Sequence, residues 1–522
     1  MWKRLFPAFL PLAVLLVLPL CLRPAPDDVK GSSGSAKPDS LIIVTPHTEQ
    51  IRYEIDHAFR KYYREKYGRS VEIDWRNVGG TSDIVRYIAD RFEAQFRMQY
   101  EESGRKWTKE TAAAFKDPKA DPAKCPERKM FLESDTGIGI DVFFGGGSYD
   151  HGKFAKIGFA VPGGVEKRHP EWFSPDVIPL THAGEQIRDP LGRYYGVCLS
   201  SFGIAYNPDR YKEIGLAPPE TWNDLGRPEL FRMTEAADPT KSGSITKCFE
   251  MILQQAMAEH GPDRGWREGF LLIRKIAANA RCVTDSAGKL VRDISSGAAA
   301  ASMCIDFYGL SEAEFSASIS RGQTRLVYVM PRNGSSVSAD PVQLLRGAPH
   351  PETAQAFLDF LLSPEGQALW MRKPGTPGGP VKYSLLRPGV RKDLYGTIPD
   401  NECSIPGYNP YHSSGTFRYH GEWTGRWFSL IRVLIKSIVL DPMDDLQEAW
   451  RAILENGGPD ENPEAMALFA ALPFELADAP GAAKRLSGTP QEIAAVRREW
   501  TAFASEKFRE AARLAREKGK KK

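Results

Sequence analysis

The sequence lacks the motifs that mark common hydrolases, metalloproteases and nucleotide-binding enzymes. It has no G-x-S-x-G, no H-E-x-x-H and no G-x-x-x-x-G-K-[ST] segment, so it offers no nucleophile elbow, no helical zinc pair and no phosphate-binding loop. Its nine histidines are scattered, and no two lie at helical metal-ligand spacing. We therefore expect no enzyme activity and no cofactor. A catalytic triad formed only in space stays open, so an extracytoplasmic hydrolase is kept as an alternative of another class.

The chain also lacks an excess of charge and any closely spaced pair of cysteines. Its 69 basic and 66 acidic residues give a net charge of +3, which predicts no nucleic-acid partner. None of the seven cysteines forms a C-x-x-C pair, so a zinc site is not expected. Six cysteines follow the N-terminal Cys21, and in an oxidising compartment they are either disulfide-bonded or free buried thiols.

The N-terminus indicates where the protein is located. Lys3 and Arg4 precede an unbroken apolar run over residues 5–22, which predicts an export signal or a membrane anchor at residues 1–22, followed by a polar linker at 23–40. Three prolines within this run would disturb a long helix, which favours an export signal over a membrane anchor. Lipidation at Cys21 is a third option. We expect the remaining chain in the periplasm or on the outer face of the cytoplasmic membrane.

The first third of the chain alternates strand and helix patterns. Residues 41–45 (LIIVT) and 71–75 (VEIDW) read as strands, and each is followed by apolar residues at helical spacing. A third strand at Ile140–Phe144 runs directly into Gly145-Gly146-Gly147. This order predicts an α/β fold, and 522 residues are enough for more than one folding unit.

The most informative segment runs from Leu326 to Trp370. It predicts a strand at Val327–Val329, a turn at Asn333-Gly334, a second short strand, and then a helix marked by Ala354, Phe357, Leu358 and Leu361. The helix leads into the phrase SPEGQ.

The sequence of this segment resembles the part of extracellular solute-binding proteins of ABC importers in which the chain re-enters the first lobe. The resemblance is to the ferric-iron, phosphonate and sugar-phosphate group. YYGVCLSSFGIAYN (194–207) resembles the strand that crosses between the lobes of such carriers. The resemblance covers about Leu41 to Trp370. It implies a two-lobed type II periplasmic-binding-protein-like fold, crossing hinge strands, hinge closure on a small solute, and delivery to a membrane permease. A receptor-coupled sensor would have the same pocket.

From the resemblance and the composition we expect this organisation: lobe 1 at 41–200 and 326–400, with a polar insertion at 93–136; lobe 2 at 201–325; and a C-terminal extension at 401–522. The extension begins with an aromatic tract, for which core packing is favoured over roofing the cleft. It ends in a charged helix whose expected apolar face holds Ile493, Val496, Trp500, Phe503 and Ala511.

The expected ligand-binding residues lie at loop ends and helix starts on both sides of the cleft. Exposed backbone N–H groups, hydroxyls and the positive ends of helices suit an oxyanion, although an isolated Thr or Ser there could be a plain helix cap. Asp306 and Tyr308 are expected to alternate along one strand and face the cleft. The full set is His47, Gly80, Thr81, Ser82, Gly146, Gly147, Ser242, Gly243, Ser244, Asp306 and Tyr308.

These residues predict a small organic anion as ligand: a phosphonate, a sugar phosphate or a carboxylate. Ferric iron is the alternative, with His47, Asp306 and Tyr308 as ligands. Some iron carriers that the chain resembles use two adjacent tyrosines where this chain has Phe307-Tyr308. One expected ligand is therefore absent, and organic anions rank first. The expected partners are this ligand and an ABC permease, with the protein itself a monomer.

Overall fold

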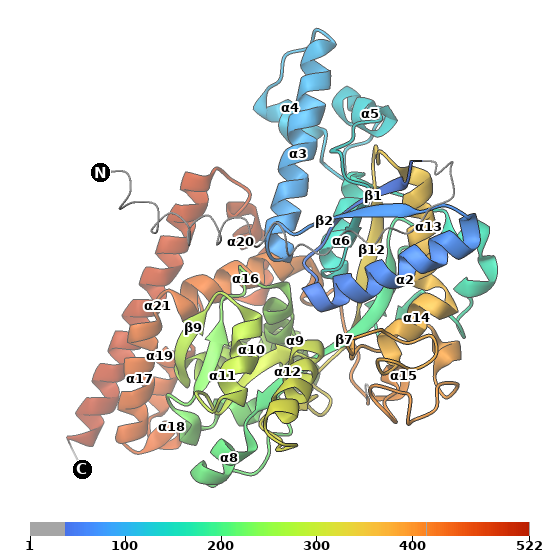
Figure 1. Ribbon diagram of the computed structural model, residues 1–522. Coiled ribbons are helices and arrows are strands. Elements are labelled where there is room, and N and C mark those ends of the chain that lie inside the picture. Colours follow the sequence, from blue (N-terminus) through green and yellow to red (C-terminus); the bar gives the residue numbers. More distant parts are fainter. Residues whose placement is uncertain (1–36, 414, 521–522) are drawn as a thin grey trace, which may run out of the picture. The chain divides into compact units, whose positions relative to one another are not determined.

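The computed structural model describes residues 37–413 and 415–520 (Figure 1). The predicted signal or anchor at 1–22 and most of the linker lie outside these residues. Ser40 onward forms one compact unit. Within the described part of the chain, no helix is long and apolar enough to cross a membrane. The six cysteines of this part are all free thiols.

The first lobe is built on a sheet whose neighbouring strands follow the order β2-β1-β3-β12-β7. β1 pairs with β3 in parallel, and β12 lies antiparallel to both β3 and β7. Apolar residues of the strands pack against two groups of helices on the sheet. Its elements are β1 (Asp39–Val44), α2 (Glu49–Tyr67), β2 (Val71–Arg76), α3 (Thr81–Glu102), β3 (Val142–Phe144), α6 (Ser148–Ile157), β4 (Ala160–Val161), α7 (Val165–Arg168), β5 (Thr181–His182), β6 (Glu185–Gln186), β12 (Val337–Leu345), α13 (Pro351–Leu362) and α14 (Pro364–Met371).

The predicted polar insertion at 93–136 does not begin at a helix end. α3 continues without a break to Glu102 and projects from the lobe, with α4 (Lys109–Ala114) and α5 (Pro126–Glu133) beside it (Figure 1). Phe96, Phe115 and Phe131 of this segment are buried in the same apolar cluster as Val44 and Phe143 of the sheet. These aromatic residues explain why a segment of polar average composition is ordered.

β7 (Tyr195–Tyr206) is the crossing strand, and all twelve of its residues are buried. Its first half pairs with β12 of the first lobe, from Tyr195 to Ser201. Its second half, from Phe202 to Tyr206, pairs with β10 of the second lobe, and Ile204 to Tyr206 pair with β11 as well. The segment between β11 and β12 returns the chain to the first lobe. The α/β class and the crossing strands expected from the resemblance are therefore confirmed.

The second lobe surrounds the strand order β7-β10-β8-β9, with helices α9 and α10 packed against each other. We define it by the elements α8 (Pro208–Ile214), β8 (Thr234–Ala237), α9 (Gly243–His260), α10 (Pro262–Ala278), β9 (Ala280–Thr284), α11 (Ala287–Ser295), β10 (Ala301–Ile305), α12 (Asp306–Ile319) and β11 (Val327–Val329). The lobe boundaries given in the sequence analysis stay predictions.

The prediction that Asp306 and Tyr308 lie on one strand is wrong, because β10 stops at Ile305 and helix α12 begins at Asp306. The Asp306 carboxylate accepts a hydrogen bond from the backbone N–H of Phe307 at 2.7 Å, and an acidic residue in the first turn stabilises a helix start. Asp306 and Tyr308 therefore do not alternate along a strand, and residues two apart on a helix point in different directions.

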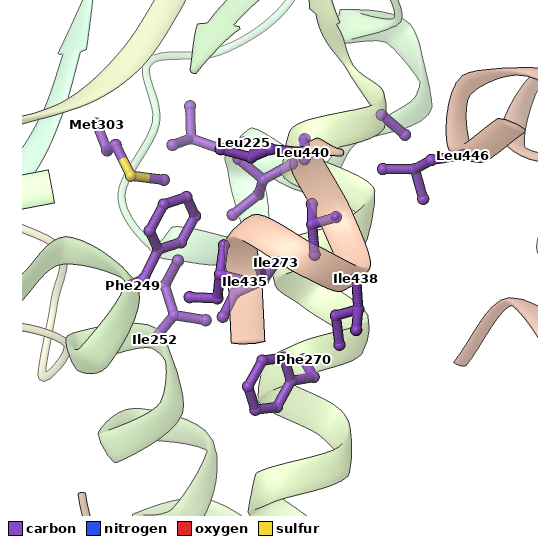
Figure 2. Packing of buried hydrophobic residues seen from close by; sticks show 14 of the residues in the cluster. Leu225, Phe249, Ile252, Phe270, Ile273, Met303, Ile435, Ile438, Leu440 and Leu446 are labelled. Carbon is purple, nitrogen blue, oxygen red and sulfur yellow. The ribbon is translucent and has the colours of Figure 1, made fainter. Parts of the chain in front are cut away.

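The C-terminal extension is mostly helical and packs on the second lobe (Figure 1). Figure 2 shows Ile435, Ile438 and Leu440 of the extension among Phe249, Phe270 and Ile273 of the second lobe, all within one apolar cluster. Its elements are α15 (Pro410–Ser413), α16 (Phe428–Ile435), a π-helical turn (Lys436–Leu440), α17 (Met443–Glu455), α18 (Gly458–Glu461), α19 (Pro463–Ala470), α20 (Ala479–Arg485) and α21 (Pro490–Gly519).

Helix α21 docks as predicted, but its buried stripe differs at two of the five predicted positions. Thr489 and Glu492 cap its start through reciprocal hydrogen bonds. Val496, Trp500 and Ala511 are buried, whereas Ile493 and Phe503 are only partly buried and Phe508 is buried instead. The stripe therefore follows a four-residue spacing from Val496 through Trp500 to Phe508.

Candidate functional site

A cavity of about 1390 Å³ lies between the two lobes and is also lined by the extension. Six helices begin at it, because the N-cap residue of each is part of the lining. In the first lobe these caps are Thr48 of α2, Gly80 of α3 and Gly147 of α6, and in the second lobe they are Ser242 of α9, Ser286 of α11 and Ile305 of α12. Each helix start carries a partial positive charge and unpaired N–H groups, so the cavity favours negative charge.

The starts of α3 and α9 meet across the cleft. A Cβ atom added at Gly80 would lie 3.3 Å from the carbonyl oxygen of Lys241, which is in the other lobe. On the α9 side, Ser242 Oγ accepts from the N–H of Ile245 at 3.3 Å and lies 3.0 Å from Ser244 Oγ. On the α3 side, the N–H of Gly80 already donates to Asp83 at 3.1 Å. Hydroxyls and N–H groups from both lobes are thus within reach of one small solute.

Nine of the residues predicted from the sequence line the cavity, and two do not. The nine are His47, Gly80, Thr81, Gly146, Gly147, Ser242, Gly243, Ser244 and Tyr308. Ser82 is in the first turn of α3 but outside the cavity lining, and its hydroxyl accepts a hydrogen bond from the guanidinium of Arg432 of the extension at 3.3 Å. Asp306 is buried and accepts from the backbone N–H and the hydroxyl of Ser201, at 2.7 and 3.1 Å.

Asp306 therefore ties α12 to the crossing strand β7. Burial raises the pKa of its carboxyl group to about 6, although the hydrogen bonds from Ser201 and Phe307 and the charge of Arg387 oppose the rise. Its position indicates a structural part in the hinge region.

A buried ionic group that sequence reasoning missed lies at the floor of the cavity. Asp340 of β12 accepts from the guanidinium of Arg387, and His47 Nε2 lies 3.2 Å from the same carboxylate. Arg387 also donates to Ser200 Oγ at 2.9 Å. Burial alone would raise the pKa of Asp340, but Arg387 and His47 together hold it well below its ordinary value.

Three polar atoms of this group have no hydrogen-bond partner within the described chain: His47 Nδ1, Asp340 Oδ1 and Arg387 Nε. All three side chains line the cavity and are more than nine-tenths buried. Buried polar atoms are normally paired, so these atoms are available to a bound solute or water. The sequence carried no local motif for Arg387, which lies beyond the segment of resemblance.

A second ionic group that sequence reasoning also missed lines the cavity beside the extension. The ammonium of Lys247 lies 2.8 Å from Glu185 Oε1 of the first lobe and 2.9 Å from Glu250 Oε2 of the second. It also lies 3.9 Å from the ring centre of Tyr419, in the aromatic tract of the extension. Phe417 of the same tract is buried in the second-lobe cluster. The tract therefore both packs in the core and walls the cavity.

The residues proposed for iron do not come together as a ligand set. Asp306 points to Ser201, and the His47 ring nitrogen Nε2 faces Asp340. Across residues 37–413 and 415–520, no group of three His, Cys, Asp or Glu side chains could hold a metal ion. His47 and Tyr308 still line the cavity, but they are separated from the third expected ligand.

Comparison with known proteins agrees with this architecture. Residues 167–395 match the family model described as bacterial extracellular solute-binding protein. The match covers less than half of the chain and shows a similarity to this family over residues 167–395.

Among curated relatives, the phosphoglycerate transport regulatory protein PgtC of Salmonella typhimurium is 28% identical over 287 residues, which are 54% of this chain and 63% of the relative. A putrescine/agmatine-binding protein of Pseudomonas aeruginosa is 27% identical over 222 residues, 41% of this chain and 58% of the relative. The chain thus spans less than two thirds of the length of the curated relatives that it matches.

Among solved structures, the periplasmic binding protein AfuA of Actinobacillus pleuropneumoniae, with fructose-6-phosphate bound, is 17% identical at a TM-score of 0.46 and covers 76% of this chain and 98% of its own. Iron-bound HitA of Pseudomonas aeruginosa is 14% identical at a TM-score of 0.42, with 76% and 98% coverage. Both TM-scores are below 0.5, so the description of the fold rests on the strand order and not on these similarities.

Proposed function

We propose that the protein is an extracytoplasmic solute-binding protein that captures a small organic anion in the interlobe cavity and delivers it to an ABC permease. The anion is a phosphonate, a sugar phosphate or a carboxylate. The observation that carries the proposal is the convergence of six helix starts on one cavity, three from each lobe. Each adds roughly half an elementary positive charge at its N-terminus, and the described cavity walls add hydroxyls and glycine N–H groups.

Within this proposal the predicted residues take specific parts. Thr81, Ser242 and Ser244 supply hydroxyls to the anion. Gly80, Gly146, Gly147 and Gly243 allow the backbone to approach it closely, and His47 and Tyr308 contact its remaining polar atoms. Lys241, directly before the Ser242 cap of α9, also lines the cavity and adds a cation. The name of the relative PgtC, a phosphoglycerate transport regulatory protein, supports a phosphorylated carboxylic acid as the first probe.

Binding works through closure and involves no bond breaking. The strand β7 and the segment between β11 and β12 connect the lobes, so rotation about them opens and closes the cavity. A solute that contacts both lobes stabilises the closed form because it binds that form better. We place the protein outside the cytoplasm, as a monomer that presents its closed form to the permease.

Two serine caps allow a matched test. Ser242 caps α9 at the cavity, and Ser363 caps α14 away from it by accepting from the N–H of Gly366 at 3.1 Å. Either Ser→Ala change costs about 1 kcal/mol of folding free energy through the lost cap. In isothermal titration with phosphoglycerate, sugar phosphates, phosphonates and dicarboxylates, only Ser242→Ala should weaken binding, by about tenfold. Equal affinities of the two variants, or no binding of any anion by the wild type, would contradict the proposal.

A further inference from the structure

The ammonium of Lys247 lies where an organic cation would bind. Two carboxylates, Glu185 from the first lobe and Glu250 from the second, contact it at 2.8 and 2.9 Å. The face of the Tyr419 ring lies 3.9 Å away, which is a cation–π distance. Carboxylates and an aromatic face are the groups that recognise alkylammonium ligands, and all four side chains line the cavity.

The two carboxylates of this compartment are held in place by hydrogen bonds from neighbouring hydroxyl groups. Glu250 is fully buried, and its Oε1 accepts from the hydroxyls of Tyr419 at 2.8 Å and Thr424 at 2.7 Å. Glu185 Oε1 accepts from Ser336 Oγ at 2.6 Å. Each acid is thus hydrogen-bonded by hydroxyl groups, and one ammonium lies between the two side chains. Without the lysine, two buried negative charges would lack a counter-ion.

The compartment is held rigidly because its aromatic wall is fixed at both ends. The Tyr419 backbone N–H donates to the carbonyl of Ala183 at 2.8 Å, and a Cβ atom on Gly184 would meet the Tyr419 carbonyl oxygen at 2.0 Å. The next residue, His420, is held by Gln254 through its N–H at 3.0 Å and its carbonyl at 2.7 Å. The ring therefore stays over the ammonium without help from a ligand.

We propose that Lys247 is a specificity-determining residue: its side chain fills the cation compartment of the cavity and thereby excludes amines from a site that accepts anions. The proposal rests on the proposed function, which it deepens by naming what is rejected and how. A free amine would have to displace an ammonium that is tethered to the protein and therefore present at a very high effective concentration. Burial lowers the pKa of Lys247, but Glu185 and Glu250 outweigh it and raise the pKa, so the lysine stays charged.

The test removes most of the Lys247 side chain by mutation and supplies the removed group as a free molecule. Lys247→Ala removes a propylammonium-sized group and leaves Glu185, Glu250 and Tyr419 in place. Propylammonium chloride should raise the melting temperature of Lys247→Ala by several degrees over an equal concentration of sodium chloride, and should leave the wild type unchanged. Lys247→Met, which fills the volume without charge, should show no propylammonium effect. A second change, Glu250→Gln, should abolish the effect in Lys247→Ala.

A control tests whether any lysine placed between two acids would give the same response to propylammonium. Lys436 lies between Asp238 at 3.4 Å and Asp441 at 3.0 Å, outside the cavity lining. Lys436→Ala should therefore gain no response to propylammonium. If Lys247→Ala responds no more than Lys247→Met or Lys436→Ala, the lysine is only an internal ion pair and the proposal is wrong.

The wild type gives a second test that does not depend on the variant folding. Titration of the wild type with 1,4-diaminobutane should show no binding. Binding that is lost in Glu185→Gln would mean that amines enter the compartment despite Lys247, and would overturn the proposal. Anion binding is measured separately on the wild type, so failure of the anion proposal and failure of amine exclusion are distinguishable.

Discussion

The carboxylate of Asp340 accepts a hydrogen bond from the guanidinium of Arg387 in the cavity lining, where Arg387 is 4% exposed and Asp340 7%. The pair joins β12, which is paired with the crossing strand, to the segment that follows α14. It thus links the hinge to the cavity floor, and each partner depends on the other for a counter-charge.

Asp340→Asn should lower the free energy of unfolding by about 3–5 kcal/mol at pH 7, because it leaves the Arg387 charge buried and unpaired. The folded-state pKa of Asp340 lies below its unfolded value, so its stabilising effect is present above about pH 4 and is lost as the pH falls. The difference between wild type and variant in urea unfolding should therefore narrow below about pH 4. Asp74→Asn, which removes an exposed partner of Arg76, should cost no more than about 1 kcal/mol.

The contribution of Asp306 to folding stability should depend on pH in the opposite direction to that of Asp340. Its pKa of about 6 in the folded state lies above the unfolded value, so folding takes up a proton between about pH 4 and 6, and stability falls as the pH rises through this window. The total effect is about 3 kcal/mol. Asp306→Asn should remove this slope from the urea-unfolding profile. An unchanged slope would show that Asp306 titrates normally.

Gly146→Ala should weaken solute binding by at least tenfold and destabilise the fold by about 1–3 kcal/mol. Gly146 lines the cavity at φ +105°, and an added Cβ would lie 2.8 Å from Thr81 Cγ2. Gly104 also has positive φ, but a Cβ there would meet nothing within 4 Å. Gly104→Ala should therefore lower stability only, and equal effects on affinity in titration would contradict a role for Gly146.

Arg432→Ala should increase the dissociation rate of the solute by about two- to fivefold, since one partly buried hydrogen bond contributes up to about 1 kcal/mol. Arg432 joins the extension to Ser82, beside the cavity, at 3.3 Å. Loss of this contact removes a link between the first lobe and the extension and eases opening of the lobes. Stopped-flow measurement should show no change for Arg451→Ala, whose side chain bonds Glu448 within its own helix α17.

The sequence predicted the parts of the fold that depend on local periodicity and on turn chemistry. The strands around Ile43 and Phe143, the turn at Asn333-Gly334 and the helix around Phe357 all rest on patterns within a few residues, and the structure contains them. The α12 start was missed because Ile305 continues an apolar run, while the hydrogen bond from the Phe307 N–H to Asp306 in the first turn is visible only in the fold.

The candidate site was predicted in part for the same reason. Glycine and serine at the ends of strands and the starts of helices mark a cavity edge, and Gly80 and Ser242 lie there. Arg387, Lys247 and Tyr419 carry no such signal, because their importance comes from charges and rings supplied by distant segments. The position of Ser82 in the sequence predicts a cavity residue, but its hydroxyl instead accepts a hydrogen bond from Arg432 of the extension.

The central claim is tested most directly by isothermal titration of the wild-type protein, at fixed ionic strength, with matched charged and neutral solutes such as phosphoglycerate and glycerol. The account predicts saturable one-to-one binding of at least one organic anion, no binding of its neutral counterpart, and at least tenfold weaker binding by Thr81→Val or Ser242→Ala. Equal binding of charged and neutral solutes, or anion binding that neither variant changes, would contradict it.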